Sequence, residues 1–369
     1  MQRLRFPIFL ETFQQTRYTS GVAAIVPLEH SMEATIRSVA KLAGVAPSTV
    51  SHYINHSAPV SPGTAQNVER AIAALNYRVN LGARGLRIRT THSVGLVIPN
   101  STTPFFGEIA QVIENALWDK GYQMLLCISQ RDLERETVQV ANLAGRQVDG
   151  ILMIYHSEQS KAVQFSKGIS MPIVFLDRPV PGEYSVATDN FYGGQLAARH
   201  LAELGHRCIG LLCGEADIRN VAERLDGFMT ELRRWGIKVR SDYILHGYQE
   251  LQFGLRISEL LKKEPRPTAV FATNDIVAVG AWRTLLEEGV RVPQEVSIIG
   301  FDDIELGRFL IPPLTTVAQP SREIGEKAVD LLLERINEKE RFANKAPTSV
   351  IISPTLHVRG STAAPAEGR

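Results

Sequence analysis

The stretch VAKLAGVAPSTVSHYIN, residues 39–55, decides the fold of the amino-terminal part of this chain. Gly44 separates two short segments in which apolar residues recur at the three- and four-residue spacing of a helix. A glycine can adopt the left-handed conformation that ends the first helix, and Pro47 suits the first turn of the second. The second helix turns Val50 and Ile54 inward, so that small hydroxyls and a histidine lie on its other faces.

A third helix follows this pair and completes a small module. It opens at Ser61 and Pro62 and buries Val68, Ile72 and Leu75. Because helices this short do not persist alone in water, the three must share one core. Two helices joined by a tight glycine turn, with a third behind them, predict a helix-turn-helix, whose second helix enters the major groove of DNA.

Charge is divided unevenly along the 369 residues, although the net charge is only +1. Residues 32–92 hold seven basic and two acidic side chains, whereas residues 93–369 hold 30 basic and 35 acidic ones. A basic module before a mildly acidic body indicates a polyanion as the partner of the module alone. The length suits two or three domains, and no apolar run approaches the roughly 18–20 residues that cross a bilayer.

The cysteine and histidine patterns argue against a metal site. Cys127, Cys208 and Cys213 lie in apolar runs without metal-ligand spacing, which is typical of small core residues in a reducing compartment. The nine histidines show no ligand motif either. We therefore expect a cytoplasmic protein with no metal, no cofactor and no membrane partner.

The segments ATIRSVAKLAGVAPSTVSHYIN and VSPGTAQNVERAIAALNYRVN, from Ala34 and Val60, carry a resemblance to a known family. They are similar to the LacI/GalR (lactose-repressor/galactose-repressor) family of bacterial transcription regulators, and the match runs to about Thr362. The resemblance implies a repressor that is a homodimer on a near-palindromic operator. The poorly patterned segment before Met32 is an extension that is unstructured or a mis-called start (1–31). The rest of the chain divides into a helix-turn-helix domain (32–79), a hinge (80–92), an effector-binding and dimerisation domain (93–362) and a tail (363–369).

Residues that contact DNA carry over from the family by position. In the family, residues at the start of the second helix and one turn later contact DNA bases. Neighbouring residues contact phosphates and so position the helix on the DNA. Gly82 and Gly85 weaken the hinge helix, so we expect residues 80–86 to be disordered without DNA. The predicted base readers are Pro47, Ser48 and His52; the phosphate contacts are Thr49, Ser51 and Asn55; the hinge contacts are Arg84, Leu86 and Arg87.

The body alternates short apolar runs with helix-length segments. This alternation predicts parallel sheets covered by helices on both faces, and about ten strands are too many for one compact sheet, so two α/β lobes are expected. The family resemblance implies the architecture of periplasmic binding proteins, in which the chain crosses between the lobes several times. The clearest runs are HSVGLVIP (92–99), MLLCIS (124–129), GILMIY (150–155), PIVFLD (172–177), CIGLLCG (208–214), AVFATN (269–274) and VSIIGFDD (296–303).

Polar residues follow these strands where a ligand of a parallel sheet would bind. Sugar-binding sites use carboxylates, amides, an arginine and aromatic rings, and the pattern here is similar to that of a bacterial ribose-binding protein. In that protein an asparagine stands where this chain has Thr103. Resemblance to the purine repressor adds Arg219 and Tyr248. The predicted effector residues are Thr103, Phe105, Phe106, Asp177, Arg178, Arg219, Tyr248, Asn274, Asp302 and Gln319, for a sugar or sugar acid rather than a purine.

Two other functions compete with this interpretation. A nicotinamide-dependent or sugar-modifying enzyme is disfavoured because no G-x-G-x-x-G follows a strand and no phosphate-binding G-x-x-x-x-G-K motif occurs. A solute-binding protein of a transporter would suit the body, but a basic three-helix module occupies the place of its export signal. We therefore expect a regulator and not an enzyme.

Overall fold

The computed structural model describes residues 34–55, 57–77, 90–337 and 346–366. The chain divides into two compact units, Met1–Leu81 and Gly82–Arg369, which we call the head and the body. The predicted extension 1–31 and most of the predicted hinge, including Arg84, Leu86 and Arg87, lie outside the described residues. Among the described helices none is long and apolar enough to cross a membrane.

The head is the predicted three-helix module. Thr35 caps the first helix by accepting a hydrogen bond from the Ser38 backbone, and Gly44 ends that helix at φ 68°. The shared core contains Val39, Val50 and Val68, each fully buried, as the periodicity predicted. The helices are α1 (Ile36–Ala43), α2 (Pro47–Asn55) and α3 (Pro62–Ala74).

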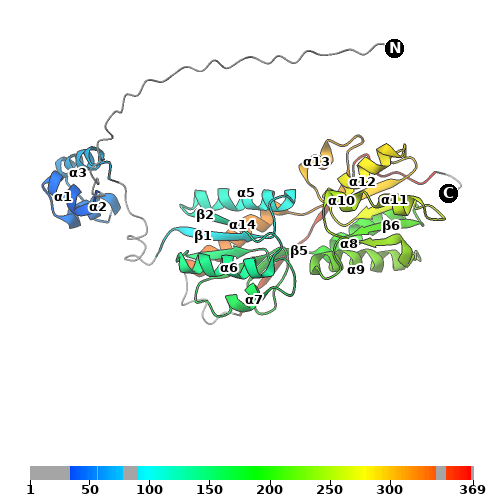
Figure 1. The fold of residues 1–369 in the computed structure, drawn as a ribbon, viewed down its shortest axis with the longest axis horizontal. Coiled ribbons are helices and arrows are strands. Elements are labelled where there is room, and N and C mark those ends of the chain that lie inside the picture. The colour runs from blue at the N-terminus through cyan, green and yellow to red at the C-terminus, as the bar shows by residue number, and fades with distance from the viewer. Residues whose placement is uncertain (1–33, 56, 78–89, 338–345, 367–369) are drawn as a thin grey trace, which may run out of the picture. The chain divides into compact units, whose positions relative to one another are not determined.

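The first lobe of the body is a six-stranded parallel sheet in the order β11-β5-β4-β3-β1-β2. Helices cover both of its faces, with α5 and α14 on one and α6 and α7 on the other (Figure 1). Its strands are β1 (Ser93–Ile98), β2 (Gln123–Ile128), β3 (Gly150–Met153), β4 (Ile173–Leu176), β5 (Ser185–Thr188) and β11 (Ser349–Ile352). Its helices are α5 (Pro104–Asp119), α6 (Leu133–Gly145), α7 (Lys161–Ser166) and α14 (Ser321–Asn337).

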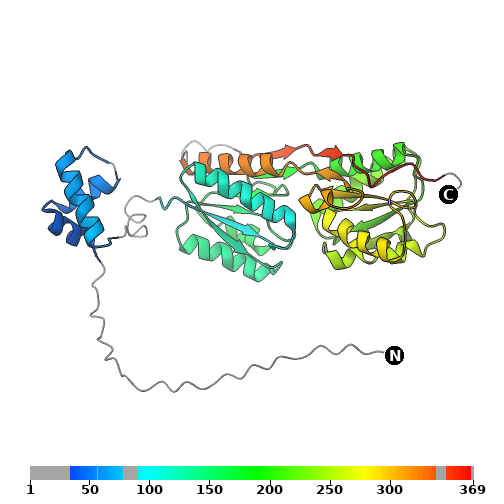
Figure 2. The ribbon, with the colours of Figure 1, turned by 90° about the horizontal axis from the view of Figure 1, so that it is seen from above.

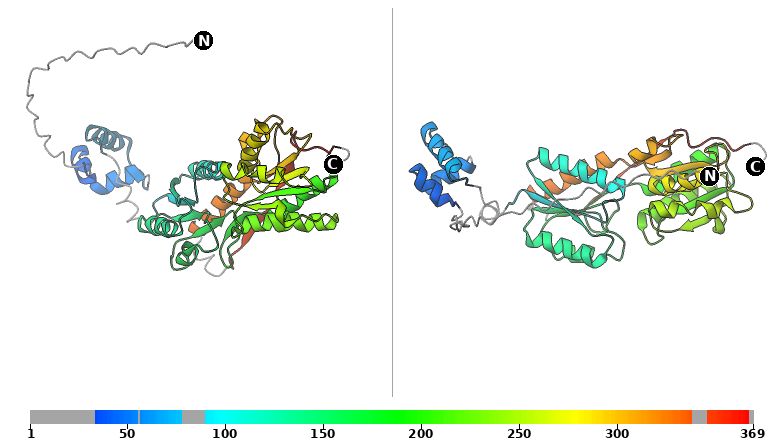
Figure 3. Two further views of the ribbon diagram at one scale, coloured as in Figure 1. Left: turned by 45° about the vertical axis from the view of Figure 1, so that its right-hand side comes forward. Right: turned by 45° about the horizontal axis from the view of Figure 1, so that its top comes forward.

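The second lobe repeats this plan in the order β12-β10-β9-β8-β6-β7, with β12 antiparallel to β10. Helices α8 and α9 pack on one face, and α10, α11 and α12 on the other (Figure 3). Its strands are β6 (Ile209–Cys213), β7 (Ile244–His246), β8 (Ala269–Ala272), β9 (Ser297–Asp302), β10 (Thr315–Ala318) and β12 (Thr355–His357). Its helices are α8 (Asn190–Glu203), α9 (Arg219–Arg234), η1 (Ser241–Tyr243), α10 (Leu251–Gly254), α11 (Ile257–Leu261), α12 (Asp275–Glu287) and α13 (Glu305–Arg308).

The chain crosses between the lobes three times, after β5, after β10 and after β11. The last crossing is visible in Figure 2 as the segment that carries β11 and β12 from one lobe to the other. The crossings start from β5, β10 and β11, which lie at or next to one edge of their sheets. We therefore call the three connections together the crossing region. The prediction of two α/β lobes with several crossings is confirmed, and each of the seven apolar runs is a strand. Cys213 is buried and Cys127 and Cys208 are half-buried; all three are free thiols.

A buried histidine fastens the carboxy-terminal segment to the second lobe. His206 lies after α8, and its Nδ1 is 2.9 Å from Thr268 Oγ1. Its Nε2 is 2.9 Å from the carbonyl oxygen of Ala363, so Nε2 carries the proton in the neutral ring. Burial, the larger effect, lowers the pKa of His206 to about 4, although the hydrogen bond to Ala363 acts in the opposite direction.

This histidine should make stability depend on pH. Because the folded pKa of about 4 lies below the ordinary value of 6.5, the unfolded chain binds a proton first as the pH falls between these values. Lowering the pH from 7.5 to 5 should therefore remove about 2 kcal/mol of stability through this group. His206→Gln should be less stable at pH 7.5 and should lose less on acidification, as measured by thermal unfolding. An equal pH dependence in both proteins would contradict this assignment.

Candidate functional site

The surface of α2 divides the predicted DNA contacts into two sets. Pro47, Ser48 and His52 are exposed, whereas Thr49 and Ser51 are half-buried beside the core. His52 Nδ1 lies 2.9 Å from the Ser57 hydroxyl, which fixes the orientation of the ring. The side chain of Asn55 lies outside what the structure describes.

Basic side chains flank this surface on the other two helices of the head. Arg37 and Lys41 of α1 and Arg70 of α3 are exposed. The Arg70 guanidinium is held by the side chain of Asn67 and the carbonyl oxygen of Gln66 within α3. Exposed short polar side chains with cations beside them are what a phosphate backbone and base edges require.

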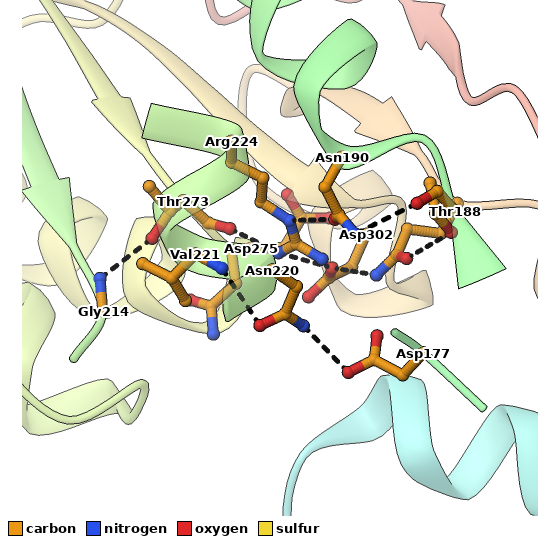
Figure 4. Close-up of polar contacts among 12 residues, drawn as sticks. Asp177, Thr188, Asn190, Gly214, Asn220, Val221, Arg224, Thr273, Asp275 and Asp302 are labelled. Atoms are coloured by element: carbon orange, nitrogen blue, oxygen red, sulfur yellow. Dashed lines mark hydrogen bonds and ion pairs between the residues drawn. The ribbon is translucent and has the colours of Figure 1, made fainter. Parts of the chain in front are cut away.

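In the body, polar side chains from both lobes meet where the strands end (Figure 4). Asp177 follows β4, Asp302 ends β9 and Gln319 follows β10, so the predicted convergence of strand ends occurs at these three positions. Asn220 Nδ2 donates to Asp177 Oδ2 at 2.8 Å, which joins the second lobe to the first. We call this cluster the lobe junction; its members are Asp177, Arg178, Thr188, Asn190, Asn220, Arg224, Asp302 and Gln319.

Gln319 ties the crossing region to the lobe junction. Its Nε2 donates to Asp302 Oδ1 at 2.8 Å, and its Oε1 accepts from the Thr188 hydroxyl at 2.7 Å. Thr188 ends β5, immediately before the first crossing, and Gln319 lies on the second crossing. These hydrogen bonds therefore connect two of the three crossings to each other and to Asp302.

Arg224 is the central cation of the lobe junction, and the sequence did not predict it. The side chain, 3% exposed, donates from Nε to Asn190 Oδ1 at 2.8 Å and from Nη1 to the Thr273 carbonyl at 2.7 Å. Nη1 also lies 3.4 Å from Asp302 Oδ1, and the guanidinium carbon is 3.7 Å from the centre of the Phe301 ring. This arginine is held by a carboxylate, an amide, a carbonyl and an aromatic face.

A pair of glycines explains how a helix residue such as Arg224 reaches the lobe junction. A Cβ on Gly194 of α8 would lie 2.0 Å from the Arg224 carbonyl oxygen, and one on Gly227 of α9 would lie 1.9 Å from the Phe191 carbonyl oxygen. The two helices can pack this closely only without those side chains. The glycines in the sequence were therefore the one signal that could have located Arg224.

Two buried atoms of the lobe junction have no hydrogen-bond partner among the residues that the structure describes. They are Asp177 Oδ1 and Arg178 Nε, in side chains that are 1% and 3% exposed. Arg178 Nη1 donates to the His156 carbonyl at 3.2 Å, and Asp177 adopts φ 71°, which is unusual for a residue other than glycine. A buried polar atom without a partner costs about 1–3 kcal/mol, so this pair points to a ligand.

Burial also changes the acidity of the lobe junction. It raises the pKa of Asp302 to about 7, and the nearby Arg224 guanidinium and the Gln319 hydrogen bond oppose the rise. Asp302 has φ 118°, in the region that favours glycine. A carboxyl group with this pKa is close to half-protonated near neutral pH and can act as either acceptor or donor.

The remaining predicted effector residues are placed in several ways. Phe105 is buried in the core of the first lobe, and its ring lies 5.8 Å from that of the half-buried Phe106. Asn274 is buried and caps α12, accepting from the Val277 backbone at 3.0 Å. Thr103 is the half-buried residue before α5. Arg219 forms an ion pair with Glu223 at 2.9 Å and donates to the Pro179 carbonyl oxygen at 3.5 Å. Tyr248 is 62% exposed. Across the described residues, no group of three or more histidine, cysteine or acidic side chains could hold a metal ion.

Comparison with known proteins agrees with both parts of the structure. Residues 35–80 match the family described as bacterial regulatory proteins, lacI family, and residues 198–362 match a periplasmic binding protein-like domain. The chain is 40% identical over 332 residues to the HTH-type transcriptional repressor PurR of Mannheimia succiniciproducens, covering 89% of this chain and 98% of that protein.

Solved structures of transcription regulators are similar to this chain over both the head and the body. A lac repressor dimer bound to operator and the anti-inducer ONPF has TM-score 0.80 at 29% identity, covering 90% of this chain and 99% of the repressor. A complex of the transcriptional regulator CelR with cellobiose has TM-score 0.67 at 32% identity, covering 89% and 99%. These relatives are regulators and not enzymes. The chain therefore belongs to the lacI family of bacterial regulatory proteins, as a DNA-binding transcriptional repressor with a ligand-binding body.

Proposed function

We propose that the protein is a cytoplasmic repressor that binds a near-palindromic operator as a homodimer and changes its operator affinity when a small molecule occupies the lobe junction. Pro47, Ser48 and His52 read bases because they are the exposed side chains of α2. Thr49, Ser51 and Asn55 position the helix on phosphates, and Arg84, Leu86 and Arg87 act in the minor groove.

One observation carries the effector site: the unpartnered Asp177 Oδ1 beside the unpartnered Arg178 Nε. An acceptor and a donor on consecutive residues can bind two neighbouring hydroxyl groups of a carbohydrate. The CelR relative with cellobiose supports this class. An aromatic ring from the first turn of α5, Phe105 or Phe106, would contact the apolar side of a sugar.

A purine is the second candidate, and the name of the relatives favours it. The chain is 40% identical to a repressor named PurR, which denotes a purine repressor. The neutral edge of a purine also offers a donor next to an acceptor, so it can satisfy the same two atoms. Hypoxanthine and guanine therefore belong in the same binding screen as the sugars.

Coupling between the two sites follows from the crossing region. An effector that draws the lobes together would change the hydrogen bonds of Gln319 and Thr188, which lie at two of the crossings. A changed lobe angle alters how the two bodies of a dimer sit and hence the spacing of the hinge segments that lead to the heads. A ligand shifts this equilibrium only by its differential affinity for the two lobe arrangements.

An exposed apolar surface on the second lobe supports the homodimer. Leu286, Phe309 and Ile311 are 67%, 72% and 88% exposed, and Leu286 and Ile311 line one groove. A patch of this kind marks a protein interface, and a two-fold dimer would use the same patch on both subunits. The lac repressor relative is a dimer on its operator.

The double variant Leu286→Glu with Ile311→Glu should be monomeric, because it places charges in the apolar patch. Operator affinity should fall about a hundredfold, since one head alone loses the gain of two linked contacts. Light scattering after gel filtration gives the mass, and a mobility-shift assay gives the affinity. Phe165→Glu, on α7 of the first lobe, is the matched control and should remain dimeric. A dimeric double variant would place the interface elsewhere.

The proposed function is tested by titrating the purified protein against genomic fragments at low and moderate salt, with and without sugars and purines. We expect a subset of promoters to bind, with an affinity that falls as salt rises and that changes with one class of compound. Failure to bind any fragment at low salt would overturn the regulator. Turnover of a sugar would favour an enzyme instead, and location in the periplasm would favour a solute-binding protein.

A further inference from the structure

The buried charges around the lobe junction do not balance. Arg178 lies 3.4 Å from Asp177, and Arg224 lies 3.4 Å from Asp302, so each of these cations already has its own carboxylate. A further carboxyl group, Glu136 of α6, is 0% exposed and has no cation in direct contact among its described neighbours. Burying a carboxylate is strongly unfavourable unless hydrogen bonds or a cation compensate it, so the surroundings of Glu136 have to account for its burial.

Glu136 is fully used as a hydrogen-bond acceptor. Its Oε1 accepts from the His156 backbone N–H at 2.8 Å, and its Oε2 accepts from the Ser160 hydroxyl. Both donors belong to the loop between β3 and α7, and both interactions suit an ionised carboxylate, which can only accept. Glu136 therefore fixes this loop with a negative charge inside it.

The same loop holds Arg178. The His156 carbonyl accepts from Arg178 Nη1 at 3.2 Å, while the His156 N–H donates to Glu136, so the two charged side chains bind opposite ends of one residue. The Tyr155 ring lies beneath the guanidinium, 4.8 Å from its carbon. Burial, the largest effect, raises the pKa of Glu136, while the hydrogen bonds from Ser160 and His156 and then the charge of Arg178 oppose the rise.

We propose that Glu136 makes the lobe junction select neutral effectors and reject anionic ones. The inference rests on the proposed function, since it concerns the same site. Two carboxylates, Asp177 and Glu136, share the field of Arg178, so its positive charge is already compensated before a ligand binds. A neutral ligand can donate to Asp177 Oδ1 and accept from Arg178 Nε, the two atoms without a partner.

An anionic group cannot meet both requirements. A carboxylate or fully ionised phosphate group at these two positions would offer acceptors alone, so it would satisfy Arg178 Nε but face Asp177 Oδ1 with a like charge. Like charges brought together in a buried interface repel strongly and weaken binding. A sugar acid, a sugar phosphate or a nucleotide still has hydroxyl or N–H donors, but it also brings a negative charge into the field of Asp177 and Glu136. The site should therefore accept a neutral sugar or purine base and reject these anions. This narrows the sugar-or-sugar-acid prediction made from the sequence to the neutral sugar.

The test measures ligand binding to the full-length protein by calorimetry. It uses the matched pair D-glucose and D-glucuronate, a second neutral and anionic pair, hypoxanthine and urate, and a library of neutral and anionic metabolites. In the wild type we expect a neutral member to bind and its anionic partner to bind at least about a hundredfold more weakly. Glu136→Gln should narrow that ratio by about tenfold or more, because it removes the buried charge and keeps the shape.

Ser160→Ala, measured at pH 8, is the matched control, because it removes one hydrogen bond to Glu136 but not its carboxyl group. The loss of this hydrogen bond raises the pKa of Glu136, and the higher pH favours the ionised form. Ser160→Ala should weaken the binding of neutral and anionic ligands equally, so the ratio of their affinities should not change. This variant remains informative if Glu136→Gln does not fold. The proposal is overturned if an anion binds the wild type as tightly as its neutral partner. It is also overturned if Glu136→Gln leaves the ratio of neutral to anionic affinity unchanged, or if Ser160→Ala changes that ratio as much as Glu136→Gln does. If the protein binds operator but no compound, the effector site itself fails and the charge selectivity with it.

Discussion

Replacing Arg178 with alanine should abolish the response to effector while operator binding stays intact. The change removes the unpartnered Nε that we assign to the ligand, together with the group that neutralises Asp177 at 3.4 Å. Losing one partner of a buried charged contact costs about 3 kcal/mol, which is about a hundredfold in effector affinity. The head has its own core and should remain folded. Calorimetry with the effector and a mobility-shift assay with the operator measure the two functions separately.

The matched variant in the head is His52→Ala, which should have the opposite effect. It removes an exposed side chain of α2 that forms no part of the core, so the domain should keep its stability. Operator affinity should fall by about 1–3 kcal/mol, and effector binding should be unchanged. Loss of both functions in either folded variant would show that the two sites are not separate.

Much of the body could be predicted because its strands are buried on both faces. Runs such as residues 150–155 and 172–177 are almost entirely apolar, and this continuity identifies a parallel strand covered by helices. Strands β7 and β12 have three residues each and mix apolar with polar residues. They lie at the two edges of the second sheet, where strands are less buried and their sequences lack a continuous apolar run. The pattern of apolar residues therefore does not identify them.

The lobe junction was predictable from strand ends but not from helices. Asp177, Asp302 and Gln319 were found because ligands of parallel sheets bind at the carboxyl ends of strands. Arg224 and Asn190 lie on α9 and α8, where a polar residue in a sequence is usually on a solvated face. What turns them inward is the close packing at Gly194 and Gly227, a long-range contact that the local pattern does not contain.

Phe105 shows the converse difficulty. Its neighbourhood resembles a sugar-binding motif, but the first turn of α5 points its ring into the core with Leu96 and Ile109. Two consecutive aromatic residues on a helix face different directions, so their rings have different neighbours. The resemblance identified the segment, and the different surroundings of the two rings come from helix geometry, which the resemblance does not contain.

Arg224→Met should destabilise the body more than any other single substitution at the lobe junction. Methionine keeps the apolar part of the side chain but removes the guanidinium over the Phe301 ring, and it leaves Asp302, at 7% exposure, without its cation. Removing one partner of a buried ion pair costs about 3–5 kcal/mol, and the Asn190 and Thr273 oxygens lose their donor as well. Urea unfolding at pH 8 should show a loss of this size.

The loss should shrink as the pH falls, and the reason lies in Asp302. Its pKa of about 7 is already raised in the wild type, and without Arg224 it rises further. A group whose folded pKa is above its unfolded value contributes stability below the unfolded pKa and loses it as the pH rises through the folded pKa. The deficit of Arg224→Met should therefore be larger at pH 8 than at pH 6, because the protonated Asp302 needs no cation.

A double-mutant cycle separates this pair from the rest of the network. Asp302→Asn in the Arg224→Met background should restore part of the stability at pH 8, since an amide can still bond to Gln319 without carrying a charge. It should not restore all of it, because the Thr273 carbonyl still lacks the arginine donor. Equal losses at pH 6 and pH 8, with no recovery in the double variant, would mean that Arg224 supports the lobe junction through its other hydrogen bonds and not through its charge.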